Sequence, residues 1–215
     1  MSVRDYYESN TRKFLVLGSQ RAIHRELYGP GVTDKDGAMH FAHDLVVEQV
    51  DRVCPDEGGK VLDLGCGVGA TCFYVADRRP VRATGVSISP RQIEIARGWN
   101  RRRSQPEQCS FVEADFAALP TILHDFDLVY SIEAFIHATD PVAYFENAAA
   151  SLRSGGRLVI IDDVLVRESD DEEMMEAFDQ DMETKRKIIA GRDAPTAAGG
   201  KGVAAVKEAV RLKDV

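Results

Sequence analysis

The sequence predicts an α/β fold, a doubly wound and mostly parallel sheet with an N-terminal helical cap and a shortened, helical C-terminal part. Short strands that are apolar throughout alternate with helices between residues 58 and 166, as expected of a parallel sheet covered on both faces. The stretch VLDLGCGVGA at residues 61–70 places a glycine-rich turn directly after the first strand. In doubly wound sheets such a turn meets the ligand.

The individual elements follow from apolar runs and from capping signals. Ser89 and Asp140 each precede a proline, the pattern of an N-cap followed by proline in the first turn of a helix. These signals predict helices at 89–103 and 140–153, and a third helix at 70–79 after the glycines. The predicted strands are 60–65, 81–87, 109–115, 126–131 and 155–164.

Two flanking parts complete the predicted organisation. Residues 1–57 are expected to form the helical cap, because apolar residues between 39 and 53 recur at helical spacing and the YGPG stretch at 28–31 marks a turn. Residues 58–166 form the ligand-binding core. Residues 167–215 are charged, methionine-rich and helical in pattern, typical of packing surfaces rather than of cofactor contacts.

Composition limits the function classes. A net charge of −8 disfavours a nucleic-acid partner. The polar start and the absence of a long apolar run predict a protein without a membrane span, expected in the cytoplasm. No metal is expected, because the cysteines show no zinc-type spacing and the acidic pair Asp162–Asp163 comes one strand later than the fourth strand. Those cysteines are Cys54, Cys66, Cys72 and Cys109.

The predicted ligand site lies at the carboxyl ends of the strands, where the glycine loop meets a helix. NAD is one candidate, but its fingerprint requires G-x-G-x-x-G and an acid about 20 residues later. Here the third glycine, Gly69, comes one position early, and the second strand ends in Ser87. A nucleoside triphosphate is disfavoured by the lack of a Gly-Lys-Ser/Thr stretch. A dinucleotide-dependent oxidoreductase therefore stays as a weaker alternative.

Five segments together resemble the class I SAM-dependent methyltransferases. They are similar, in order, to the family's five strand motifs, and the fourth looks like that of sterol and terpene C-methyltransferases and natural-product sugar O-methyltransferases. The segments are VLDLGCGVGA (61–70), GVSISPRQIEIAR (85–97), VEADFAALP (112–120), FDLVYSIEAFIHATDP (126–141) and SGGRLVIID (154–162). The start of the chain resembles the helical cap of C-methyltransferases. The resemblance implies a Rossmann-like core and S-adenosylmethionine (SAM) as cofactor.

The resemblance also implies a set of cofactor-binding positions. Asp63 would orient the amino-acid end of SAM, Gln92 would support the ribose contact, and Asp115 would accept a hydrogen bond from the adenine amine, although Asp115 is also a plausible helix cap. The full set is Asp63, Gly65, Gly67, Gly69, Ser87, Ile88, Gln92, Asp115, Phe116 and Ser131.

Two residues after the fourth strand are the catalytic candidates. Glu133 and His137 are four positions apart, and they would share one face if this segment were helical. His137 could act as a general base toward an oxygen acceptor. With an alkene acceptor, Glu133 and aromatic rings could stabilise a carbocation. The expected substrate-binding rings are Tyr6, Tyr7, Tyr28 and Phe135.

The expected function is methyl transfer from SAM to a carbon or oxygen of a small, apolar, isoprenoid-like or natural-product molecule. Members of the family usually close the sheet with a sixth and an antiparallel seventh strand. Here only VRLKDV at 210–215 could begin a sixth. Either the chain is a fragment, or the exposed edge is covered by the helical tail or by a second subunit, as in a homodimer. A SAM-binding domain that lacks turnover and acts through a partner is the alternative.

Overall fold

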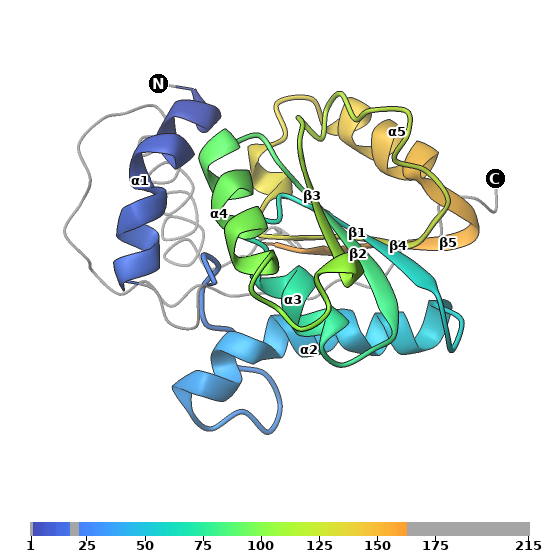
Figure 1. The fold of residues 1–215 in the computed structure, drawn as a ribbon, viewed down its shortest axis with the longest axis horizontal. Coiled ribbons are helices and arrows are strands. Elements are labelled where there is room, and N and C mark those ends of the chain that lie inside the picture. The colour runs from blue at the N-terminus through green and yellow to red at the C-terminus, as the bar shows by residue number, and fades with distance from the viewer. Residues whose placement is uncertain (1, 18–21, 163–215) are drawn as a thin grey trace, which may run out of the picture.

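The chain folds around a five-stranded parallel sheet with helices on both faces (Figure 1). The structure is a computed structural model that describes residues 2–17 and 22–162. Its strands lie in the order β3-β2-β1-β4-β5, so the direction of winding reverses at β1. Every strand pair is parallel, which confirms the predicted fold class. The strands are β1 (Gly59–Leu64), β2 (Val81–Ser87), β3 (Cys109–Glu113), β4 (Phe126–Ile132) and β5 (Leu152–Ile161).

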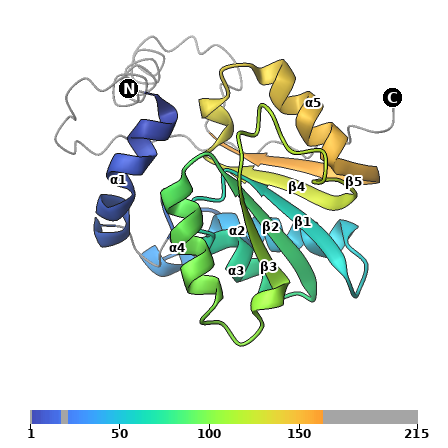
Figure 2. The same ribbon diagram turned by 45° about the horizontal axis from the view of Figure 1, so that its top comes forward.

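Helices cover the two faces unequally. Residues of α2, α3 and α4 pack with Val61, Leu128 and Tyr130 in one buried cluster. Tyr144 of α5 packs with Leu62 in a second cluster on the opposite face. Figures 1 and 2 show these two layers, with α1 lying beside α4. The helices are α1 (Val3–Leu17), α2 (Lys35–Val53), α3 (Ala70–Ala76), α4 (Pro90–Asn100) and α5 (Pro141–Ser151), with short 3₁₀ turns at Pro106–Gln108 and Phe135–His137.

The predicted helix starts are confirmed by their caps. Ser89 Oγ accepts a hydrogen bond from the Gln92 N–H at 3.2 Å, and Asp140 Oδ1 accepts one from the Ala143 N–H at 3.1 Å. The predicted end of α5 is wrong, because β5 already begins at Leu152. Arg153 explains the difference: its guanidinium donates to Asp127 and to the Val53 carbonyl, which holds this stretch extended beside β4.

The helical cap has two described helices, α1 and α2, and residues 22–34 directly before α2 form neither helix nor strand. The predicted C-terminal part, residues 167–215, lies outside the described residues. So do the VRLKDV stretch and the end of the strand predicted at 155–164. Of the described helices, none is long and apolar enough to span a membrane.

Gly69 is the glycine whose replacement should most affect stability. It has a left-handed φ of +87°, and a Cβ there would lie 2.5 Å from Phe111 Cε1 in the core. We expect Gly69→Ala to lower the free energy of unfolding by about 1–3 kcal/mol, through backbone strain and overpacking. Gly98→Ala is the matched control, since its Cβ would meet only Arg101 Nη2 at 3.9 Å inside helix α4. Denaturant unfolding of both variants checks the prediction, and equal stability of the two would contradict it.

Candidate functional site

A cavity of about 320 Å³ opens at the carboxyl ends of β1, β2, β3 and β4. It lies where the sheet reverses its winding, the usual ligand site of such folds. Helix α1 and residues 22–24 form the rest of its wall. Eleven residues predicted from the sequence line it: Tyr7, Asp63, Gly65, Gly67, Ser87, Ile88, Gln92, Asp115, Phe116, Glu133 and His137.

The glycine loop forms the floor of the cavity. The N–H groups of Gly65 and Cys66 both donate to the Val86 carbonyl at 2.9 Å, which folds the loop tightly over the end of β2. Gly65 has φ +93°, and a Cβ there would lie only 2.4 Å from Ala134 Cβ. A side chain at this position would therefore separate the loop from the segment after β4. Gly69 is not a wall residue; it is the N-cap residue directly before α3.

Asp63 brings an acidic group into the cavity from inside the sheet. It is 3% exposed, its Oδ2 accepts a weak hydrogen bond from Cys72 Sγ at 3.5 Å, and Tyr130 is a second hydrogen-bonding neighbour. Burial raises the pKa of this carboxyl to about 7. Among the described residues no basic side chain forms an ion pair with it. A buried carboxyl of this kind marks a functional site and favours a cationic ligand group.

The ends of β2 and β3 form the opposite wall. Ser87 Oγ donates to Gln92 Oε1 at 2.7 Å and accepts from the Ser89 N–H, so the Gln92 side chain is held in place beside the cavity. Asp115 Oδ1 accepts from the Ala117 N–H at 2.8 Å. Asp115 therefore serves as a turn cap and also lines the cavity. The capping interpretation is confirmed, and the contact of Asp115 with adenine stays a prediction.

Polar contacts hold helix α1 in place across the mouth of the cavity. Arg4 pairs with Glu113 at the end of β3 at 2.8 Å. Glu8 accepts from Ser89 Oγ and from the Arg91 N–H at the start of α4. Arg4 and Glu8 were not predicted from the sequence, because nothing local indicates which part of the core α1 would contact.

Tyr7 and His137 meet in the cavity wall. Tyr7 Oη lies 2.8 Å from His137 Nε2, and the two rings pack edge to face. Burial raises the pKa of Tyr7 well above its usual value. Tyr7 was predicted as a substrate-binding ring, and its direct hydrogen bond to the catalytic candidate is a finding of the structure.

Glu133 lies on the same wall but in a conformation the sequence did not indicate. The segment after β4 is a single 3₁₀ turn at Phe135–His137, so the helical face expected to join Glu133 and His137 does not form. Glu133 instead has φ +49°, and its N–H donates to the Ile161 carbonyl. Its carboxylate accepts from the backbone N–H and the Nε of Arg25 at 3.3 and 3.2 Å.

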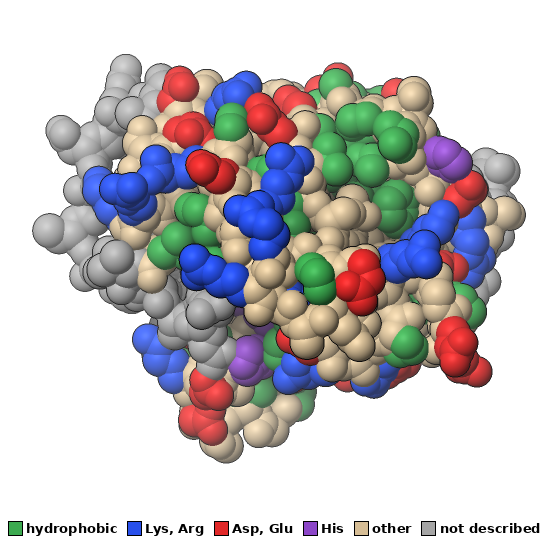
Figure 3. Space-filling view, in the orientation of Figure 1, with side chains coloured by type: hydrophobic (Ala, Val, Ile, Leu, Met, Phe, Trp, Pro, Cys, Tyr) green, Lys and Arg blue, Asp and Glu red, His purple; other side chains and the backbone are tan. Residues whose placement is uncertain are grey.

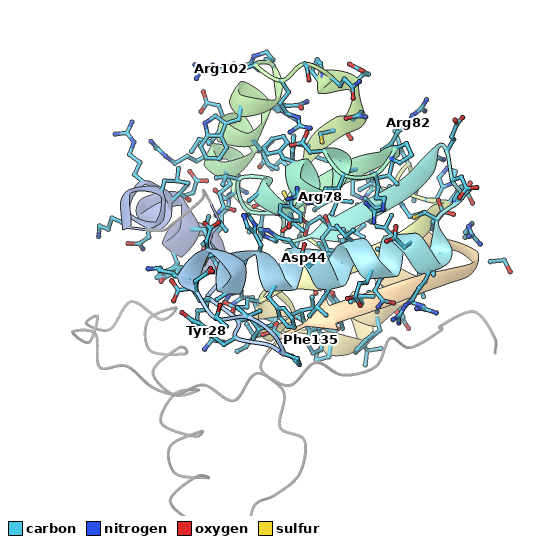
Figure 4. All side chains as sticks on the ribbon, turned by 90° about the horizontal axis from the view of Figure 1, so that it is seen from below. Tyr28, Asp44, Arg78, Arg82, Arg102 and Phe135 are labelled. Carbon is cyan, nitrogen blue, oxygen red and sulfur yellow. The ribbon has the colours of Figure 1, made fainter. Side chains whose placement is uncertain are left out.

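Besides Gly69, four predicted residues lie away from the cavity wall. Ser131 is fully buried beneath it and accepts a hydrogen bond from Tyr144 Oη at 2.9 Å. Tyr6 packs on Tyr7 with ring centroids 5.3 Å apart. Tyr28 is 62% exposed, and Phe135 packs on Tyr144 and Phe145; both are labelled in Figure 4. These positions do not support direct contact with a ligand in the described cavity.

Over residues 2–17 and 22–162, no group of three or more His, Cys, Asp or Glu side chains is arranged to hold a metal ion.

The chain is similar to curated methyltransferases over part of their length. It is 37% identical over 121 residues to an O-methyltransferase of Pyrenophora dematioidea, which covers 56% of this chain and 45% of that protein. It is 30% identical over 169 residues to the methyltransferase GfsG of Streptomyces halstedii, covering 79% of this chain and 60% of the relative. The chain thus spans about half the length of these relatives.

Solved structures and a family comparison agree with this similarity. The [4+2]-cyclase SpnF superposes with a TM-score of 0.67 at 27% identity, covering 78% of this chain and 61% of SpnF. Geranyl diphosphate methyltransferase shares the fold, with a TM-score of 0.65 at 16% identity and coverage of 84% and 72%. A family model described as a methyltransferase domain matches residues 55–207. The chain belongs to this methyltransferase family, class I as its motifs predicted, whose cofactor is SAM.

Proposed function

We propose that this protein transfers a methyl group from SAM to a hydroxyl oxygen of a small, natural-product-like molecule. The observation that carries the proposal is the cavity itself. One wall offers a buried carboxyl, Asp63, for a cationic ligand group, and the opposite rim offers the Tyr7–His137 pair for a proton. On the face drawn in Figure 3, basic and acidic side chains are interspersed, which fits a small-molecule acceptor better than nucleic acid.

The residues present fit the chemical groups of SAM. Asp63 would bind the ammonium group, and the close approach allowed by Gly65 and Gly67 would admit the amino-acid portion. Ile88 and Phe116 would sandwich the adenine, whose amine would donate to Asp115. Bound SAM would supply a sulfonium-activated methyl group, so the remaining task of the protein is to position and deprotonate the nucleophile.

Tyr7 and His137 provide a path for the proton that an acceptor hydroxyl must lose. Burial keeps Tyr7 protonated at neutral pH, so it cannot act as a preformed phenolate. It can instead accept the proton of the acceptor hydroxyl while passing its own to His137 Nε2, 2.8 Å away. The imidazole is a suitable final base because its ordinary pKa lies near neutrality.

An oxygen acceptor fits Glu133 better than an alkene. Stabilising a carbocation would require a carboxylate directed at the acceptor, but Glu133 is engaged with Arg25. We therefore assign Glu133 a positioning role in place of the catalytic role expected from the sequence. The similarity to an O-methyltransferase of Pyrenophora dematioidea supports the same choice.

A product assay tests this proposal. The protein is incubated with SAM and matched sets of phenols, aliphatic alcohols and isoprenoid alkenes, and methylated products are identified by mass spectrometry. We expect O-methyl products, with one S-adenosylhomocysteine (SAH) formed per methyl transferred. Products from alkenes alone would favour carbon methylation. SAH binding without transfer to any acceptor would favour the alternative of a SAM-binding domain that lacks turnover.

A further inference from the structure

Residues 22–27, here called the strap, close one side of the cofactor cavity. Ala22, Ile23 and His24 line it. Ile23 Cδ1 would lie 3.4 Å from a Cβ built on Gly67, so the strap packs directly on the glycine loop. Beyond the cavity the Leu27 N–H donates to the Ala38 carbonyl at 2.9 Å. The position of the strap therefore determines how closely the loop and a ligand are enclosed.

A chain of three histidines connects the strap to helix α2. His24 Nε2 lies 2.7 Å from His43 Nε2, and His43 Nδ1 lies 3.3 Å from His40 Nδ1. His24 Nδ1 lies 2.9 Å from the Arg25 carbonyl oxygen. Both nitrogens of His43 are thus occupied by other imidazoles, and this residue is only 2% exposed.

The Arg25 carbonyl determines where the protons of the neutral chain lie. A carbonyl can only accept, so His24 Nδ1 carries a proton and His24 Nε2 is an acceptor. His43 Nε2 must then donate to His24, which leaves His43 Nδ1 as the acceptor for His40 Nδ1–H. Each of the two hydrogen bonds between histidines therefore contains one proton. A proton added to His24 would place two donors across the 2.7 Å link unless the whole chain changed tautomer.

The surroundings of His43 also oppose a positive charge. On its own helix it faces His40, from the strap it faces His24, and across from it lie the Tyr74 ring and Arg78. Tyr74 Oη donates to Asp44, and Arg78 stacks on the Tyr74 ring; Figure 4 labels Asp44 and Arg78. Burial, with the neighbouring histidines and Arg78, lowers the pKa of His43 to about 2.

We propose that His43 is a positioning residue for cofactor binding, which holds the strap against the glycine loop through its hydrogen bond to His24. The inference rests on the proposed binding of SAM in the cavity. It also implies that acid opens the strap. Once the strap lifts away, His43 Nε2 meets water and takes up a proton at its ordinary pKa of about 6.5. The closed strap excludes that proton, so closure is favoured above this pH and lost below it.

Glutamine is the informative replacement for His43. Its amide N–H₂ can donate to His24 and its carbonyl can accept from His40, so both hydrogen bonds can form while position 43 itself no longer titrates. His43→Gln should therefore bind SAH like wild type at pH 8 and lose part of the acid dependence. His24→Phe cannot form the hydrogen bond to His43 and should bind SAH more weakly even at pH 8. His124→Gln is the matched control, since the His124 side chain is 60% exposed and, in the part of the chain that the structure describes, pairs with its neighbour Asp125 alone.

The test is calorimetric titration of the full chain with SAH from pH 8 to pH 5.5. Protonation of Asp63 alone should weaken binding about 30-fold over this range, and the strap should add up to about tenfold more in wild type and in His124→Gln. In His43→Gln the additional loss from the strap should be smaller than in wild type. If SAH binds at pH 8 and the pH profiles of wild type and His43→Gln coincide, the strap inference is wrong. If SAH does not bind wild type at pH 8, the proposed function fails instead.

Discussion

Replacing Asp63 by Asn should weaken SAM and SAH binding by at least about 30-fold and should stabilise the unliganded protein. The carboxyl is buried without a basic partner among the described residues, and a bound ammonium group would supply that partner. Loss of one member of a buried charged pair costs about 2–5 kcal/mol of binding. Without ligand, the same carboxyl lowers the free energy of unfolding, because an ionised group at this buried position is desolvated. Calorimetry and thermal unfolding measure the two effects.

The gain in stability of Asp63→Asn over wild type should increase with pH. Burial raises the Asp63 pKa from 3.8 to about 7, so the folded protein holds a proton that the unfolded chain releases. Wild-type stability should therefore fall, relative to Asp63→Asn, as pH rises from about 4 to 7, and the difference should be constant above pH 7. A constant difference across this range would contradict the assignment.

Asp127→Asn is the matched control for this variant. Asp127 is also a buried strand aspartate, but it accepts from Arg153 Nε and from the Lys60 N–H. Its replacement should lower the unfolding temperature, the opposite of Asp63→Asn, and should leave SAH affinity unchanged, whereas Asp63→Asn weakens it. If both variants destabilise the protein to the same extent, Asp63 has a structural role only.

Removing either member of the Tyr7–His137 pair should reduce turnover by about 10²- to 10⁴-fold, the usual contribution of general acid–base catalysis. Tyr7→Phe deletes the hydroxyl that relays the proton, and His137→Ala deletes the base that receives it. Neither residue is assigned to the SAM contacts, so the dissociation constant of SAH should change by less than about threefold. Single-turnover methyl transfer at saturating SAM measures the chemical step directly.

Tyr6→Phe is the control for the tyrosine relay. Tyr6 is the neighbouring residue on α1, but it is not part of the cavity wall, so its variant should keep wild-type turnover. Because both variants remove one hydroxyl from the same helix, a general effect on α1 would reduce both rates alike. Wild-type turnover in Tyr7→Phe would show that the proton leaves by another route.

The sequence was sufficient for the sheet and for most of the cavity. Apolar runs and capping signals identify strands and helices locally, and the carboxyl ends of parallel strands must meet at one edge. Asp63, Ser87 and Asp115 could therefore be assigned to one crevice without coordinates. Tail residues 167–215 lie outside the described part of the chain, so the expectations for them stay predictions.

The directions of individual side chains and the contacts between distant segments could not be predicted from the sequence. Strand alternation puts Tyr130 on the α3 face and Ser131 on the α5 face, where it meets Tyr144, which explains why Ser131 lies beneath the cavity wall. The Tyr7–His137 contact joins residues 130 positions apart. The strap contacts depend likewise on how the cap docks. No local pattern encodes such pairs, because they arise from tertiary packing.

A crystal structure of the protein with bound SAH tests the central claim most directly. We expect the amino group of the ligand within hydrogen-bonding distance of Asp63, the adenine between Ile88 and Phe116, and the sulfur facing Tyr7 and His137. An empty cavity at saturating SAH, or a ligand whose sulfur points away from the tyrosine–histidine pair, would contradict the account.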